Sequence, residues 1–197
     1  MPTAQQPNLL EVDWSKIPAP KDDGAAQHLE GMTVPDVALT ATDGTQVSLG
    51  KLAGRVVVFA YPRTGKPGQI ALVDDWDMIP GARGCTPQTC AFRDLHQVMI
   101  AAGAARVFGL STQDPAYQHE AAERLHLPFP LLSDESLALT KALRLPTMDV
   151  AGLTLIKRLA LIVDDARIVK VFYPVFPPDR NAGDVLVWLE QNKRGRA

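Results

Sequence analysis

The stretch "GRVVVFAYP" at residues 54–62 decides the fold class, because a continuous run of β-branched and aromatic residues ends in a proline. Such a run is typical of a strand buried on both faces of a sheet. Pro62 lacks a backbone donor and therefore ends the strand. A similar run, "ARVFGLST" at 105–112, follows later in the chain and predicts a second buried strand. The pair predicts a sheet with helices packed on its faces.

The segments around these two strands complete an α/β pattern. Asp43 and Gly44 interrupt two short alternating runs, which indicates a hairpin. Asp114 and Pro115 are a typical N-cap and first residue of a helix. We expect helices near 86–102, 114–126, 133–145 and 181–194, and a second hairpin over 157–175. The order of these elements predicts a mixed central β-sheet flanked by helices.

The chain divides into an N-terminal arm and one domain. Residues 1–31 are polar, and Leu9, Leu10 and Trp14 are their candidate anchors. Residues 32–197 are long enough to bury a sizeable core. Residues 63–84, which are rich in glycine and proline and lack periodicity, predict a long loop inserted before a helix.

Composition excludes several classes of function. The 197-residue chain has a net charge of −2 and no basic stripe, so we expect no nucleic-acid partner. Its apolar runs are too short to span a membrane, and the first residues do not resemble a signal peptide. These features predict a cytoplasmic protein with no membrane partner.

The two cysteines of the chain, Cys85 and Cys90, lie in one short stretch, "GCTPQTC" at 84–90. In a reducing cytosol a close pair is catalytic, redox-sensing or metal-binding more often than a structural disulfide. Zinc would need two further ligands, and the four histidines show no ligand spacing around the pair. We therefore expect no metal and no other cofactor. The alternative is a pair of buried, unreactive thiols.

The position of Cys85 at the start of a predicted helix favours its thiolate, because free N–H groups and the helix dipole stabilise negative charge there. If the helix includes Cys85, five residues advance about 7.5 Å along the axis. The two Cα atoms of a disulfide must lie within about 7 Å of each other. A disulfide between Cys85 and Cys90 would then require local unwinding of the helix. If Thr86 is the N-cap, the two cysteines can touch without unwinding. The sequence leaves both arrangements open.

A reactive thiolate that is oxidised to sulfenic acid needs a partner thiol to keep the oxidation reversible. Cys90 is the one candidate, so we predict that a peroxide oxidises Cys85 and that Cys90 then condenses with it. A peroxide-responsive redox sensor or regulatory binding protein would use the same pair without turnover. A general thiol–disulfide oxidoreductase is disfavoured, because the two cysteines of such an enzyme stand closer together in sequence than Cys85 and Cys90 do.

Four segments resemble the Q-type peroxiredoxins, also called the bacterioferritin-comigratory-protein-like group. They are "GCTPQTCAFRDL" at 84–95, the hairpin and strand at 34–62, the segment at 107–143, and "KRLALIVDDARIVKVF" at 157–172. The resemblance implies a thioredoxin-like fold and the thiol-dependent reduction of hydrogen peroxide and organic hydroperoxides. It also implies a thioredoxin or glutaredoxin-like reductant and a monomer.

The resemblance also implies roles for individual residues. Cys85 matches the peroxidatic cysteine and Cys90 the resolving cysteine. Arg158 matches the arginine that holds the thiolate and the peroxide, which suits a permanent cation. Pro62 matches the proline that shields the site after the first core strand.

One position departs from the family pattern. Ala82 stands three residues before Cys85, where the family has a threonine that contacts the thiolate and peroxide. Thr64 is the nearest substitute, provided that the loop folds back so that its ends converge. Trp76, Met78 and Ile79 in the same loop either form an apolar wall that favours bulky organic hydroperoxides or only attach the loop to the protein surface, and the sequence leaves both open.

Overall fold

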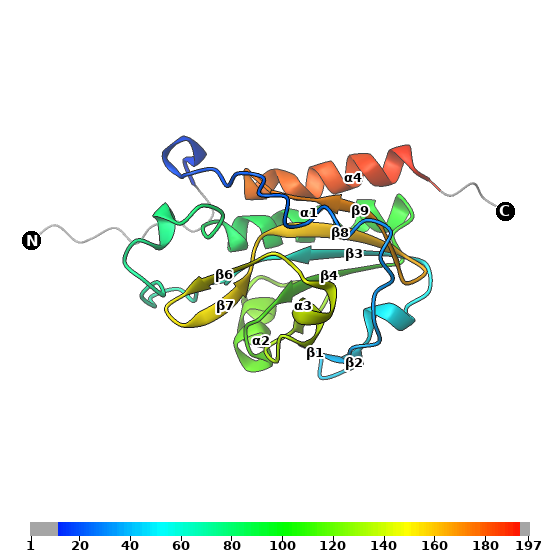
Figure 1. The fold of residues 1–197 in the computed structure, drawn as a ribbon, viewed down its shortest axis with the longest axis horizontal. Helices are drawn as coiled ribbons and strands as arrows, with labels where there is room; N and C mark the ends of the chain where they lie inside the picture. The colour runs from blue at the N-terminus through cyan, green and yellow to red at the C-terminus, as the bar shows by residue number, and fades with distance from the viewer. Residues whose placement is uncertain (1–11, 194–197) are drawn as a thin grey trace, which may run out of the picture.

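Strand β3 (Arg55–Ala60) lies inside a seven-stranded mixed sheet, as the sequence predicts for this stretch (Figure 1). The strand order is β2-β1-β5-β4-β3-β8-β9. β3 pairs in parallel with β4 on one side and antiparallel with β8 on the other, and all six of its residues are buried. The other strands of the sheet are β1 (Leu39–Ala41), β2 (Gln46–Val47), β4 (Arg106–Ser111), β5 (Leu131–Ser133), β8 (Leu159–Asp164) and β9 (Arg167–Phe172). The structure, a computed structural model, describes residues 12–193.

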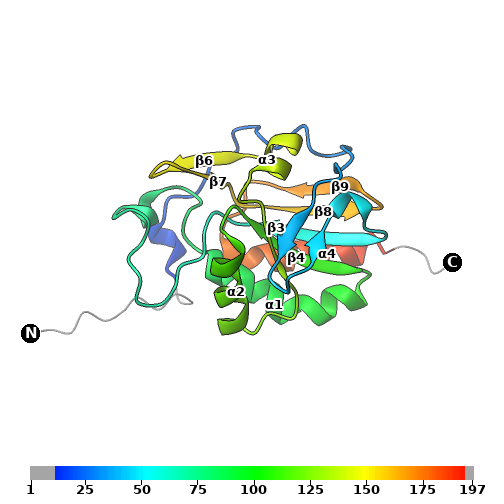
Figure 2. The same cartoon turned by 90° about the horizontal axis from the view of Figure 1, so that it is seen from below.

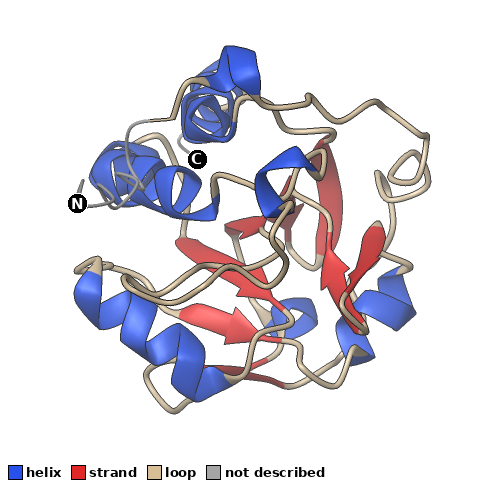
Figure 3. Cartoon of the chain, turned by 90° about the vertical axis from the view of Figure 1, so that its left-hand side faces the viewer, coloured by secondary structure: helices blue, strands red, loops and turns tan. Residues whose placement is uncertain are grey.

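Helices cover both faces of this sheet, so that each face has its own hydrophobic core (Figure 2, Figure 3). Phe59 points to the face covered by α1 (Cys85–Ala101), α2 (Pro115–Arg124) and α4 (Asn181–Gln191). Its ring stacks on Phe92 of α1 with centroids 4.1 Å apart. Val58 points to the opposite face, which is covered by α3 (Ala138–Leu143) and the segment that precedes β3.

The segment 133–145 differs from its prediction, because it begins as a strand. Leu131–Ser133 pairs with both β4 and β1, and the helix starts only at Ala138. The buried Asp134 carboxylate accepts hydrogen bonds from the backbone N–H groups of Leu139 and Thr140, and so fixes that start. A hairpin of β6 (Thr147–Val150) and β7 (Leu153–Ile156) was not predicted either. Pairing with β1 and β4 makes β5 a strand, because this segment is too short to show the alternating hydrophobic period of a strand.

The arm packs onto the domain in its described part, residues 12–31. Trp14 donates from Nε1 to Asp179 at 3.0 Å and meets the ring of Phe176 edge-on. Leu29 has no exposed surface and belongs to the core. Two other predicted anchors, Leu9 and Leu10, lie outside the described residues. The arm therefore reaches the region where α1 and α4 begin.

Asp23 ties the middle of the arm to the segment around β8 and β9. Its carboxylate accepts from Lys157 Nζ at 2.6 Å and from the Tyr173 hydroxyl at 2.7 Å. The Lys157 hydrogen bond and then the Tyr173 hydrogen bond hold the pKa of Asp23 far below its usual value. Lys157 precedes Arg158, so the arm is fastened next to a predicted site residue.

Within residues 12–193, no helix is both long and apolar enough to cross a membrane. The same part of the chain contains no cluster of three or more histidine, cysteine, aspartate or glutamate side chains that could hold a metal ion.

Candidate active site

Gly84 fixes the start of α1. Its φ is +104°, a left-handed conformation that favours glycine. A Cβ atom here would lie 2.6 Å from Pro178 Cγ and 2.7 Å from the Trp14 ring, so the position has no room for a side chain. The arm and the start of the 3-10 helix Pro178–Arg180 therefore close over this end of α1.

Cys85 is the first residue of α1 and Cys90 lies in its second turn. Both are buried, free thiols. The structure thus has the arrangement in which the helix includes Cys85, with an axial advance of about 7.5 Å to Cys90. A disulfide between them requires the first turn of α1 to unwind.

Arg158 places a permanent positive charge beside the Cys85 sulfur. Its Nη2 lies 3.3 Å from Cys85 Sγ, and its side chain is 2% exposed. The same nitrogen donates to the carbonyl oxygens of Gly81, Ala82 and Arg83 at 3.1–3.2 Å. In the thiol form, Cys85 donates from Sγ to Ala82 O at 3.6 Å. The guanidinium therefore both holds the end of the loop, through its carbonyl oxygens, and faces the thiol.

Gln88 and Asn181 support Arg158, and sequence reasoning missed both. Arg158 Nη1 donates to Gln88 Oε1, and Gln88 Nε2 donates to Asn181 Oδ1 at 2.9 Å. All three side chains are buried. Asn181 thus orients the Gln88 amide so that its oxygen faces the guanidinium. The sequence feature that could have identified Gln88 as a site residue is its position three residues after Cys85, on the same face of the helix.

Cys90 has a different environment from Cys85. It is 7% exposed, and burial raises the pKa of its thiol, with only a smaller opposing effect from the Arg93 charge. Arg93 itself is bonded to Asp94 and to the Leu125 carbonyl. The Cys90 thiol is therefore protonated at neutral pH while α1 is intact.

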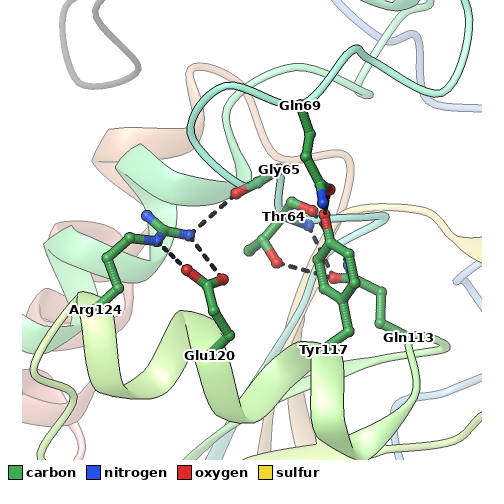
Figure 4. A network of polar contacts seen from close by, with 7 residues as sticks. All are labelled: Thr64, Gly65, Gln69, Gln113, Tyr117, Glu120 and Arg124. Carbon is green, nitrogen blue, oxygen red and sulfur yellow. Dashed lines mark hydrogen bonds and ion pairs between the residues drawn. The ribbon is translucent and has the colours of Figure 1, made fainter.

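Thr64 is completely buried and lines the same cavity as Cys85, so the start of the loop does fold back to the site. Its N–H and hydroxyl both donate to Gln113 Oε1, at 2.9 and 3.0 Å, and Gln113 Nε2 donates to Thr64 O at 3.1 Å (Figure 4). Because its proton is committed to Gln113, this hydroxyl is left as an acceptor. Pro62 is buried after β3, accepts from Ser111 Oγ through its carbonyl, and does not line the cavity.

A cavity of about 420 Å³ opens beside Cys85, between the loop and the start of α2. Trp76 lines it, as predicted, together with Ile70 and Leu72. Met78 is 60% exposed, and neither it nor Ile79 is among the lining residues. The apolar wall therefore comes largely from a different part of the loop than the sequence analysis expected.

A buried cysteine at the start of a helix, facing a buried arginine that directly precedes β8, is typical of a thiol-based redox protein. The redoxin family profile matches residues 29–186. Peroxiredoxin Q of rice (Oryza sativa subsp. japonica), named as chloroplastic, is 36% identical over 163 residues, which cover 82% of this chain and 66% of the rice protein. The wheat (Triticum aestivum) protein of the same name is 33% identical over 181 residues and covers 88% of this chain and 75% of its own.

Solved structures agree with these sequence matches. The peroxidoxin BcpB of Mycobacterium tuberculosis superposes with a TM-score of 0.67 at 27% identity, over 84% of this chain and 98% of that one. Xanthomonas campestris peroxiredoxin Q has a TM-score of 0.66 at 23% identity, over 85% and 98%. The chain belongs to the redoxin family, in its peroxiredoxin Q group. This confirms the predicted thioredoxin-like fold and the predicted family.

Proposed function

We propose that this chain reduces hydroperoxides, with Cys85 as the peroxidatic thiol and Cys90 as the resolving thiol. The observation that carries the proposal is the 3.3 Å contact between Arg158 Nη2 and Cys85 Sγ at the first residue of α1. The thiolate is the nucleophile, and the guanidinium is placed to stabilise the negative charge of the reacting atoms.

The first step is an attack by the Cys85 thiolate on the terminal oxygen of the hydroperoxide. The S–O bond forms as the O–O bond breaks, and the leaving alkoxide takes up a proton and departs as an alcohol, or as water from hydrogen peroxide. The sulfur is oxidised to sulfenic acid and the peroxide is reduced by two electrons. Arg158 is placed to stabilise the negative charge that spreads over the breaking O–O bond.

Thr64 supplies the polar contact that Ala82 lacks. Its hydroxyl gives its proton to Gln113 and keeps lone pairs for the O–H group of the hydroperoxide. This contact would direct the terminal oxygen toward Cys85. Pro62, buried next to Thr64, holds the start of the loop rather than contacting the substrate.

The second step joins the two cysteines. The first turn of α1 unwinds, the Cys90 thiol attacks the sulfur of the Cys85 sulfenic acid, and water leaves as the disulfide forms. Unwinding brings Cys90 into water and removes the burial that raises its pKa. An external dithiol protein, thioredoxin or a glutaredoxin-like donor, then returns two electrons and two protons. Action as a monomer and a cytoplasmic location remain predictions.

Peroxide consumption with a thioredoxin system tests the proposal. We expect turnover by the wild type and none by Cys85→Ser. Cys90→Ser should form a sulfenic acid, trapped by dimedone and seen by mass spectrometry, and then stall. A Cys85→Ser variant with full activity would overturn the assignment. A wild type that oxidises once and is not recycled by thioredoxin or glutaredoxin would instead indicate the redox sensor.

A further inference from the structure

The cavity beside Cys85 carries an excess of positive charge. Its charged lining residues are Arg63, Lys66, Arg83 and Asp77. Asp77 and Arg83 neutralise each other, because Arg83 Nη1 lies 2.6 and 2.8 Å from the two Asp77 oxygens. Arg63 and Lys66, at the cavity wall, have no ion-pair partner in the part of the chain that the structure describes.

Both cations lie against one aromatic ring. Arg63 Cζ is 4.7 Å and Lys66 Nζ is 4.4 Å from the centroid of the Tyr117 ring. Neither forms an ion pair with any carboxylate within residues 12–193. Two like charges near one ring repel each other, and an anion that contacts both would relieve that repulsion.

The backbone that carries these cations is fixed in place. Thr64, between them, has three hydrogen bonds with Gln113. The next residue, Gly65, accepts from Arg124 Nη2 at 3.1 Å, and Arg124 is itself paired with Glu120 on α2 (Figure 4). The cation pair is therefore built on an anchored segment, although it lies on a long loop.

Another side of the cavity wall is apolar and open to solvent. Ile70 is 91% exposed, and Leu72 and Trp76 line the same space. An exposed isoleucine at the mouth of a cavity offers contact area to a hydrophobic ligand. The cavity thus combines a cationic side, an apolar side and a thiol.

We propose that the preferred substrates are organic hydroperoxides that carry a carboxylate. This inference rests on the proposed peroxidase function and names its substrate class. Arg63 and Lys66 bind the carboxylate, Ile70 and Trp76 contact the apolar body, and the hydroperoxide group reaches Cys85. The whole chain has a net charge of −2, so a preference for anions must come from this local pair of cations.

A matched pair of substrates tests the inference: cumene hydroperoxide and its para-carboxylate derivative. The measured quantity is the ratio of their second-order rate constants for Cys85 oxidation, followed by stopped-flow tryptophan fluorescence. We expect the wild type to prefer the carboxylate by about tenfold at low salt, with the preference falling as salt is added. The double variant Arg63→Gln/Lys66→Gln should lose most of this preference. Lys141→Gln, an exposed cation on α3 away from the cavity, should retain it.

The outcomes separate the two proposals. If the wild type oxidises at the same rate with both substrates, or if the double variant keeps the wild-type ratio, the carboxylate subsite is wrong and the peroxidase function stands. If neither substrate oxidises Cys85, the peroxidase function itself fails. Loss of the preference in Lys141→Gln as well would assign it to overall charge and overturn the subsite.

Discussion

Cys85 and Cys90 share one helix and are both buried, yet their surroundings prepare them for opposite tasks. Cys85 lies at the helix start, 3.3 Å from a guanidinium nitrogen. Cys90 lies one turn further, where burial raises its thiol pKa. In the proposed mechanism, helix position and one long-range cation therefore separate the nucleophile, Cys85, from the Cys90 thiol, which acts only after the helix opens.

The two environments also differ in what holds them. The Cys85 side depends on a chain of buried polar groups, Arg158, Gln88 and Asn181, that come from three different segments. The charges that act on Cys90 come from Arg93 and Asp94 on the same helix and from Arg124 on α2. Changes that act on the first group should therefore affect Cys85 without altering Cys90.

The largest effect is expected from Arg158→Met, which removes the cation and keeps the volume. The rate of Cys85 oxidation by peroxide should fall by about 100-fold, the scale seen when one donor to a developing negative charge is removed. Single-turnover stopped-flow fluorescence measures it. Arg93→Met, which removes a cation from the Cys90 side, is the matched control and should change the rate far less. Equal losses in both variants would mean that general charge, rather than the contact with Cys85, matters.

Gln88→Leu should have a smaller effect of the same kind, about tenfold, because it leaves Arg158 in place but removes the hydrogen-bond acceptor of its Nη1. If Gln88 acts by positioning Arg158, its loss should cost little more in a protein that already carries Arg158→Met. Full additivity of the two substitutions would contradict this positioning role.

Glycines at the two ends of α1 offer a test of how tightly the Cys85 side is packed. Gly84 and Gly103 have nearly the same φ, +104° and +105°, but only Gly84 has neighbours at its Cβ position. Gly103→Ala should cost about 1–2 kcal/mol from backbone strain alone. Gly84→Ala should cost about 1–3 kcal/mol more, because of Pro178 and Trp14. Urea unfolding measures both, and equal costs would show that the arm does not close over this site.

The smallest effect concerns the Cys90 thiol. In Cys85→Ser, its thiolate absorbance should titrate above the ordinary cysteine pKa of about 8.5, because burial disfavours the charge. The unfolded chain releases this proton first, so stability should decline as the pH rises from about 8.5 toward the folded pKa. The same protein in urea is the control. An identical titration midpoint in the folded and unfolded states would mean that α1 does not shield Cys90.

Local sequence patterns predicted the elements that have a strong period or clear end signals. The strand at 54–62 and the helix beginning at Asp114 and Pro115 lie where they were expected. The helix predicted over 133–145 was wrong at its start, because Leu131–Ser133 forms a strand through pairing with β1 and β4. The choice between two helix starts at Cys85 also needed the structure, which shows Gly84 as a left-handed N-cap with no room for a Cβ atom beside Pro178 and Trp14.

By itself, the sequence determined the buried central strand, the cysteine pair and the position of Cys85 near a helix start, because periodicity and capping are properties of neighbouring residues. The resemblance to peroxiredoxins added Arg158 as a candidate. Only the tertiary structure decided what surrounds the thiol: Arg158 is 73 residues away in sequence, and Asn181 lies 93 residues beyond Gln88. The sheet brings such distant groups together, and no local pattern reports which side chains its strands and helices place side by side.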